Sequence, residues 1–92
     1  MAPVALNVGF YNYVITDKVI ALVSSDSAPM RRLVQEFRKE GRLIDATQGR
    51  KTKSLIFLDS GNLATSALSQ ETLAKRLTGT ANGQDNDEEA ED

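Results

Sequence analysis

Three cations follow a glycine between two apolar stretches of the chain. The glycine and the cations are Gly49, Arg50, Lys51 and Lys53. The flanking stretches 43–44 and 55–58 contain the β-branched and aromatic residues of strands, so we expect a β-hairpin with the cations at its tip. Basic side chains on a rigid tip are the residue types that contact DNA phosphates and base edges. A basic turn that serves only solubility is the alternative interpretation.

Charge is distributed unevenly along the chain, although the formal net charge is only -2. Six of the thirteen acidic residues lie in the last eight positions, whereas all eleven Lys and Arg lie at or before Arg76. Residues 1–77 therefore carry eleven cations and seven anions, a net charge of +4, and eight of those cations fall within 31–53. A basic body with an acidic tail favours a polyanionic partner.

The composition predicts one domain followed by a tail. Residues 1–77 have the apolar content of a single globular domain, and a domain of this size often gains stability by forming oligomers. Residues 78–92 contain no large apolar side chain, so we expect a disordered acidic tail. The tail serves solubility or, as an alternative, competes within the molecule for the basic surface.

The residue types that are missing limit the possible functions. The sequence has no histidine and no cysteine, and therefore lacks the usual general base, the usual metal ligands and a thiol nucleophile. We expect a protein that is not an enzyme and that has no cofactor and no metal site. The longest apolar run, Val19–Val23, is far too short to span a membrane, so we expect a cytoplasmic, nucleoid-associated protein without a membrane partner.

The first quarter of the chain has the pattern of three strands. Val4, Leu6 and Val8 alternate with smaller or polar residues, as in a strand with one buried face. A second strand is predicted over 11–15. The uninterrupted apolar run 19–23 predicts a third strand that is covered on both faces. Together the three strands predict a β-meander.

Two helices are predicted, one long and amphipathic and one short. Apolar residues recur at helical spacing after a serine-rich segment, and Gly41 follows as a C-terminal cap. The apolar residues are Met30, Leu33, Val34 and Phe37. A strand over 63–68 and a short helix capped by Ser69 follow the hairpin. The order βββ-α-βββ-α predicts a small α+β domain of antiparallel strands.

Eight stretches of the chain together have the sequence pattern of one known family. They are Asn7–Phe10, Asn12, Lys18–Ala21, Asp26–Pro29, Leu43–Thr47, Gly49–Arg50, Asp59–Ser60 and Gln70–Thr72. Through these stretches the chain resembles the RemA family of small bacterial regulators of extracellular-matrix and biofilm genes. The resemblance implies a DNA-binding transcription regulator with a fold similar to the LytTR type. It also implies closed homo-oligomeric rings with duplex DNA around the outside. The DNA-contacting positions of the family match Lys18, Arg50 and Lys51.

The chain departs from the family pattern at three positions. Tyr11 stands where the family has glycine, and Gln48 stands where it has tyrosine. Lys51 replaces an arginine, which keeps the charge but loses the planar fork that binds guanine or phosphate through two hydrogen bonds.

These observations predict a DNA-binding transcription regulator that grips duplex phosphates through Lys18, Arg50, Lys51 and Lys53 on repeated protomers. An RNA-binding module is the first alternative, because Phe10, Tyr11 and Tyr13 could stack on bases. A scaffold whose basic surface binds an acidic protein is the second alternative.

Overall fold

The structure is a computed structural model that describes residues 4–79. The elements are β1 (Ala5–Gly9), β2 (Asn12–Ile15), the 3₁₀ helix η1 (Thr16–Lys18), β3 (Val19–Ser24), α1 (Ala28–Lys39), β4 (Leu43–Asp45), β5 (Ser54–Leu58), β6 (Leu63–Ser66) and α2 (Gln70–Leu77). This order confirms the predicted succession of strands and helices, with η1 as an addition. The predicted acidic tail lies, from residue 80 onward, outside the described residues.

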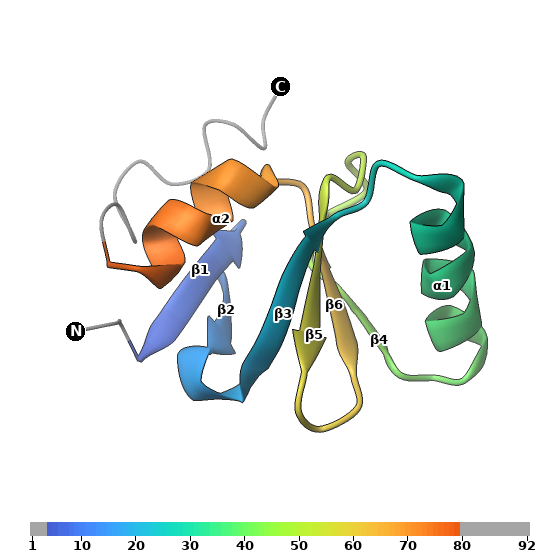
Figure 1. Ribbon diagram of the computed structural model, residues 1–92, viewed down its shortest axis with the longest axis horizontal. Helices are drawn as coiled ribbons and strands as arrows, with labels where there is room; N and C mark the ends of the chain where they lie inside the picture. Colours follow the sequence, from blue (N-terminus) through green and yellow to red (C-terminus); the bar gives the residue numbers. More distant parts are fainter. Residues whose placement is uncertain (1–3, 80–92) are drawn as a thin grey trace.

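A four-stranded sheet with the order β3-β5-β6-β4 forms the centre of the molecule. Helix α1 lies on one side of this sheet, and α2 and the β1–β2 pair lie on the other (Figure 1). Strand β5 is covered on both faces: Leu55 packs toward α1 with Val34, whereas Ile56 packs toward β1 and α2 with Leu6 and Leu73. The α+β class is confirmed, and all strand pairs except β4–β6 are antiparallel.

The predicted hairpin is wrong. Strands β4 and β5 do not pair, because β6 lies between them and pairs with β4 in parallel, Leu43 opposite Leu63 and Asp45 opposite Thr65. Apolar stretches on both sides of a short loop indicate two strands, but they do not indicate that the strands are neighbours. The cationic segment is therefore a connection that crosses the end of β6.

The predicted β-meander is also wrong. Strand β2 pairs only with β1, and β3 joins the other sheet as an edge strand beside β5. The expectation that residues 19–23 are covered on both faces fails at Ile20, whose side chain is 68% exposed. Pairing shifts by one residue between Val19 and Ala21, so Ile20 occupies a β-bulge and turns outward.

Both predicted helices are confirmed, together with their caps. The Ser27 hydroxyl accepts a hydrogen bond from the Met30 N–H at the start of α1. At its end Gly41 has φ +74°, and the Arg42 N–H donates to the Phe37 carbonyl, which completes a Schellman motif. Ser69 caps α2 in the same way as Ser27 caps α1.

Candidate nucleic-acid interface

The cationic loop spans residues 46–53, between β4 and β5, and its first end is tied to β6. Oδ1 of Asp45 accepts hydrogen bonds from the Thr47 hydroxyl at 2.7 Å, the Thr47 N–H at 3.0 Å and the Thr65 hydroxyl at 3.1 Å. These bonds stabilise the ionised carboxylate and hold the pKa of Asp45 below its ordinary value, with the largest contribution from Thr47. Burial opposes this effect, and Arg38 adds a weaker attraction.

A tight turn at residues 47–50 presents Arg50. The Arg50 N–H donates to the Thr47 carbonyl at 2.9 Å. Gln48 and Gly49 have φ values of +53° and +80°, and positive φ at both central positions is the pattern of a type I′ turn. Thr47 is buried, whereas Gln48, Gly49 and Arg50 are exposed. The turn therefore projects Arg50 from a buried base into solvent.

The far end of the loop is fixed by two serines. The Lys53 N–H donates to the carbonyl of Ser66 at 2.8 Å, and the Lys53 carbonyl accepts from the Ser25 N–H at 3.2 Å. The Ser25 hydroxyl donates to the Thr52 carbonyl at 2.8 Å. Lys51 lies between the two fixed ends and is exposed. The loop thus has anchored ends and a solvent-exposed cationic tip.

Arg50 also contacts the turn between β1 and β2. Its guanidinium carbon lies 5.9 Å from the centroid of the Phe10 ring, within the range of a cation–π contact. Phe10 and Tyr11 have φ values of +53° and +63°. The Asn12 side-chain amide holds this turn by donating to the carbonyls of Gly9 and Phe10. Two turns that are distant in sequence therefore meet at Arg50.

The structure brings together only part of the predicted site. Arg50, Lys51 and Lys53 share the loop, but Lys18 lies at the end of η1, where its carbonyl accepts from the Asp59 N–H. The register of β3 and β5 places this position beyond Val19, whereas the loop adjoins Ser24 at the other end of β3. Five residue steps at about 3.3 Å each put roughly 17 Å between the two ends. Within one protomer, Lys18 is therefore separate from the loop.

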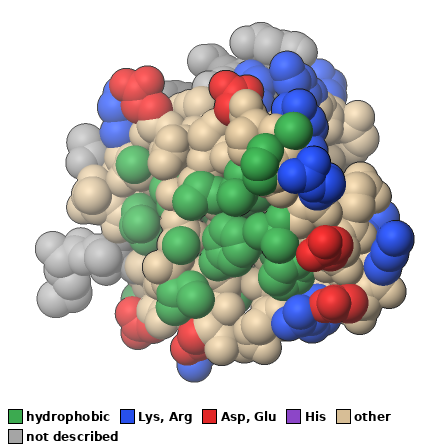
Figure 2. Space-filling view, turned by 45° about the vertical axis from the view of Figure 1, so that its right-hand side comes forward, with side chains coloured by type: hydrophobic (Ala, Val, Ile, Leu, Met, Phe, Trp, Pro, Cys, Tyr) green, Lys and Arg blue, Asp and Glu red, His purple; other side chains and the backbone are tan. Residues whose placement is uncertain are grey.

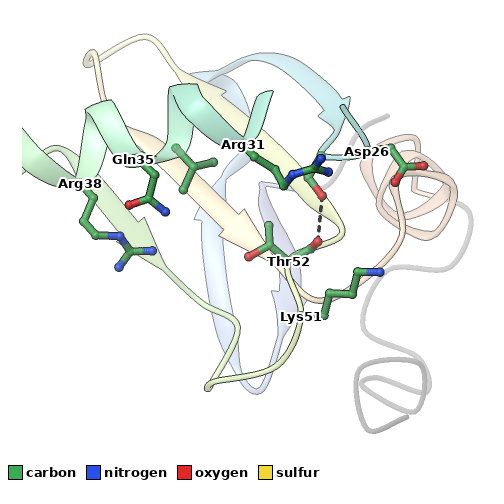
Figure 3. A pocket seen from close by; sticks show the side chains of 8 residues that line it. Asp26, Arg31, Gln35, Arg38, Lys51 and Thr52 are labelled. Atoms are coloured by element: carbon green, nitrogen blue, oxygen red, sulfur yellow. Dashed lines mark hydrogen bonds between the residues drawn. The ribbon is translucent and has the colours of Figure 1, made fainter. Parts of the chain in front are cut away.

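Sequence reasoning missed two cations beside the loop. Arg31 and Arg38 of α1 line one pocket together with Lys51 (Figure 3). The concentration of cations within 31–53 was a signal for them, but it did not indicate which helical cations face the loop. Phe10 was considered only as a base-stacking residue, because the sequence does not show that the β1–β2 turn reaches Arg50.

A metal-ligand group and a membrane-spanning helix are both absent from the part of the chain that the structure describes. Residues 4–79 contain no group of three or more Cys, Asp and Glu side chains that could hold a metal ion. None of the helices within these residues is long and apolar enough to cross a membrane.

The geometry defines a small α+β protein with an exposed, anchored cationic loop. Residues 5–77 match the RemA-like family, described as "Extracellular matrix regulatory protein A-like". The chain belongs to this family, as its sequence motifs predicted.

Curated relatives agree with this assignment. A protein of Nitratidesulfovibrio vulgaris is 52% identical over 73 residues, which cover 79% of this chain and 83% of the relative. A protein of Synechococcus elongatus is 52% identical over 77 residues, which cover 84% of this chain and 88% of the relative. The first is named "Putative regulatory protein", and the name of the second begins with the same words. The family and these names support a regulatory role and indicate a regulator, not an enzyme.

Proposed function

We propose that the protein is a transcription regulator that binds duplex DNA through Arg50, Lys51 and Lys53, with Lys18 as a further phosphate contact. The observation that carries this proposal is the anchored cationic loop with its tip in solvent. Loop ordering opposes binding when a flexible segment must be fixed on a ligand. Here hydrogen bonds to Ser25, Thr65 and Ser66 already hold the loop, so its cations can meet phosphates at little further ordering cost.

The proposed regulator acts as a homo-oligomeric ring in the cytoplasm, on the nucleoid. Separation of Lys18 from the loop supports an assembly of repeated copies, because a duplex that crosses several protomers contacts both the loop cations and Lys18.

The surface also offers apolar area for self-association. Large apolar side chains that are at least 48% exposed are Val4, Tyr11, Tyr13, Ile15, Ile20 and Ile44. Figure 2 shows hydrophobic side chains gathered on one face, with cations at its edge. The proposed targets are extracellular-matrix and biofilm genes, and the mention of the extracellular matrix in the family description supports the first of these.

Arg50→Ala tests the proposal directly. We expect duplex affinity to fall at least about tenfold, because each charge-assisted hydrogen bond to a phosphate contributes about 1.5–3 kcal/mol. Stability should change by less than about 1 kcal/mol, since Arg50 is exposed and its cation–π contact with Phe10 is weak at such a position. Fluorescence anisotropy with a labelled duplex and urea unfolding measure the two effects.

Arg32→Ala is the matched control for Arg50→Ala. It removes the same charge from an exposed position on α1. Equal losses of duplex affinity in the two variants would show that the effect of Arg50→Ala comes from net charge alone. Unfolding or dissociation of the Arg50 variant would make Arg50 a structural residue and would contradict the proposal.

One observation favours binding of single-stranded RNA as a second candidate function. The Tyr11 side chain is 86% exposed, and its neighbour Phe10 contacts Arg50, so an aromatic ring and a cation lie close together. Exposed rings beside cations are typical of surfaces on which single-stranded bases stack. Competition between duplex DNA and a single-stranded RNA for the protein separates the two functions. Preference for the RNA, lost in Tyr11→Ala, would replace the DNA proposal.

A further inference from the structure

A recessed pocket lies between α1 and the far end of the cationic loop. Its volume is about 270 Å³, slightly below the roughly 300–1,000 Å³ that is typical of small-ligand sites. Arg31, Gln35 and Arg38 form one wall, because their spacing of four and three residues places them on one stripe of the helix. Lys51 and Thr52 line the pocket from the loop, on the side opposite the helix (Figure 3).

The pocket has the charge of an anion-binding site. Three cations, from Arg31, Arg38 and Lys51, line it together with a single carboxylate, that of Asp26. The excess of two positive charges matches a phosphate monoester, which carries about -1.5 to -2 at neutral pH. Guanidinium groups bind such oxygens through paired hydrogen bonds. The Asp26 carboxylate is an acceptor that suits a hydroxyl group of the same ligand.

The wall opposite α1 is held in place by the contacts that hold the loop. The Ser25 hydroxyl also lines the pocket and donates to the Thr52 carbonyl at 2.8 Å. Val34, which is 8% exposed, supplies an apolar part of the lining. A cavity with fixed walls, an apolar contact and few convergent polar groups has the general character of a small-molecule site.

We propose that this pocket binds a small hydroxylated phosphate ester, such as a sugar phosphate or a mononucleotide. Arg31 and Arg38 contact the phosphate from α1, and Lys51 contacts it from the loop. Lys51 is also one of the cations assigned to DNA, so ligand and duplex compete for it. The competition between ligand and duplex rests on the proposed function, whereas binding of the ligand in the pocket does not.

A titration of the ¹⁵N-labelled full chain with ribose 5-phosphate tests the pocket, at constant ionic strength. We expect saturable amide shifts centred on Ser25, Gln35 and Thr52, with a Kd below about 1 mM. Inorganic phosphate should shift the same amides with weaker affinity, and ribose should not. Shifts centred on Lys18, or no saturation, would overturn the proposal. Equal affinity for inorganic phosphate would show that a free anion, and not an ester, is the ligand.

Two double variants separate the pocket from general charge. Arg31→Ala/Arg38→Ala should weaken ribose 5-phosphate binding at least about tenfold, since two charge-assisted contacts are lost. Arg32→Ala/Lys39→Ala removes the same charge from exposed positions of α1 outside the pocket lining and should change affinity less than about twofold. Equal losses in both pairs would overturn the proposal. If the first pair misfolds, Lys51→Gln provides the same test from the loop.

A duplex-binding assay tests the competition. Saturating ribose 5-phosphate should weaken duplex binding by the wild-type protein about tenfold and leave that of Arg31→Ala/Arg38→Ala unchanged. A wild-type protein that binds the sugar phosphate but no duplex would remove the proposed function and leave the pocket in place. Duplex binding that does not respond to the ligand would overturn the competition.

Discussion

Residues with left-handed backbone conformation lie in the two turns beside Arg50. Phe10, Tyr11 and Gln48 are the non-glycine residues with positive φ within residues 4–79, and they lie in the two turns that meet at Arg50. Bulky side chains rarely adopt this conformation, which costs roughly 1–2 kcal/mol per residue. Local backbone strain of this kind is a common feature of binding sites. The two turns therefore hold Arg50 at some cost in stability.

Tyr11→Gly should stabilise the protein. Glycine adopts φ +63° without strain, and the RemA family pattern has glycine at this position. The gain is offset in part by the greater freedom of glycine in the unfolded chain, so we expect a net increase of about 0.5–1 kcal/mol in the free energy of unfolding. Urea unfolding measures the change.

Tyr13→Gly is the control for the Tyr11 variant. Tyr13 lies within β2, is 55% exposed and has no positive φ, so glycine there should lower stability. A loss of stability in both variants would show that the Tyr11 ring contributes more through its contacts than its backbone costs.

At the scale of elements, the first end of the loop is held by one carboxylate, that of Asp45. Asp45→Asn should lower the free energy of unfolding at pH 7 by about 1 kcal/mol, because the charged acceptor of three hydrogen bonds is lost at a position that is partly exposed. The folded-state pKa of Asp45 is lowered, so its contribution is complete above the unfolded-state pKa and is lost as the pH falls through the folded value. The difference between wild type and variant should therefore shrink below about pH 4.

Urea midpoints measured from pH 7 down to pH 2 check this dependence. Asp59→Asn removes the same charge from an exposed position after β5 and serves as the control. A gap between wild type and the Asp45 variant that stays constant with pH would show that the ionised carboxylate does not hold the loop.

Local signals in the sequence predicted both helices, because the signals that mark a helix lie close together in the chain. These signals are the apolar stripe, the serine that caps the N-terminus and, for the first helix, the glycine that ends it. Strand positions were also predicted, since alternation and apolar runs mark them. The pairing of the strands was not predicted correctly, because an apolar run such as 55–58 indicates burial and does not indicate which strand lies alongside. The same limit applied to the site. Arg50, Lys51 and Lys53 are adjacent in sequence, whereas the contact with Phe10 and the pocket with Arg31 arise only from tertiary structure.

On the scale of the whole molecule, the separation of Lys18 from the loop makes a quantitative prediction. One protomer offers three clustered cations, and each neutralised phosphate contributes about -0.9 to the slope of log affinity against log salt, so a single protomer should give a slope near -3. A duplex that contacts several protomers of a ring should give a slope steeper than about -6. Anisotropy titrations with long and very short duplexes measure both values.

Sedimentation of the same samples is the control for the slope measurement. A closed oligomer should be present under the binding conditions, and the short duplex should return the shallow slope. A monomeric protein, or a slope that does not change with duplex length, would contradict the ring while leaving simple DNA binding possible.

The acidic C-terminal segment gives a further prediction from charge alone. Deletion of residues 80–92 removes six negative charges and keeps Thr78 and Gly79, which cap α2. Duplex affinity should rise a few-fold at low salt and return toward the wild-type value near physiological salt, where the Debye length is about 8 Å. A full-length chain in which the six acids are replaced by their amides is the control. Unchanged affinity at low salt would leave solubility as the role of the segment.

Strand β6 determines when both ends of the cationic loop can be held during synthesis of the chain. Thr65 accepts from the Ala46 N–H and bonds to Asp45, and Ser66 accepts from the Lys53 N–H, so both ends of the loop are attached to a strand that follows it in the chain. A nascent chain that ends after β5 already contains every proposed DNA-binding residue but lacks the strand to which both ends of the loop are attached. Synthesis must therefore pass residue 66 before both ends of the loop are attached to β6, so the loop takes its final shape only late in the synthesis of the domain.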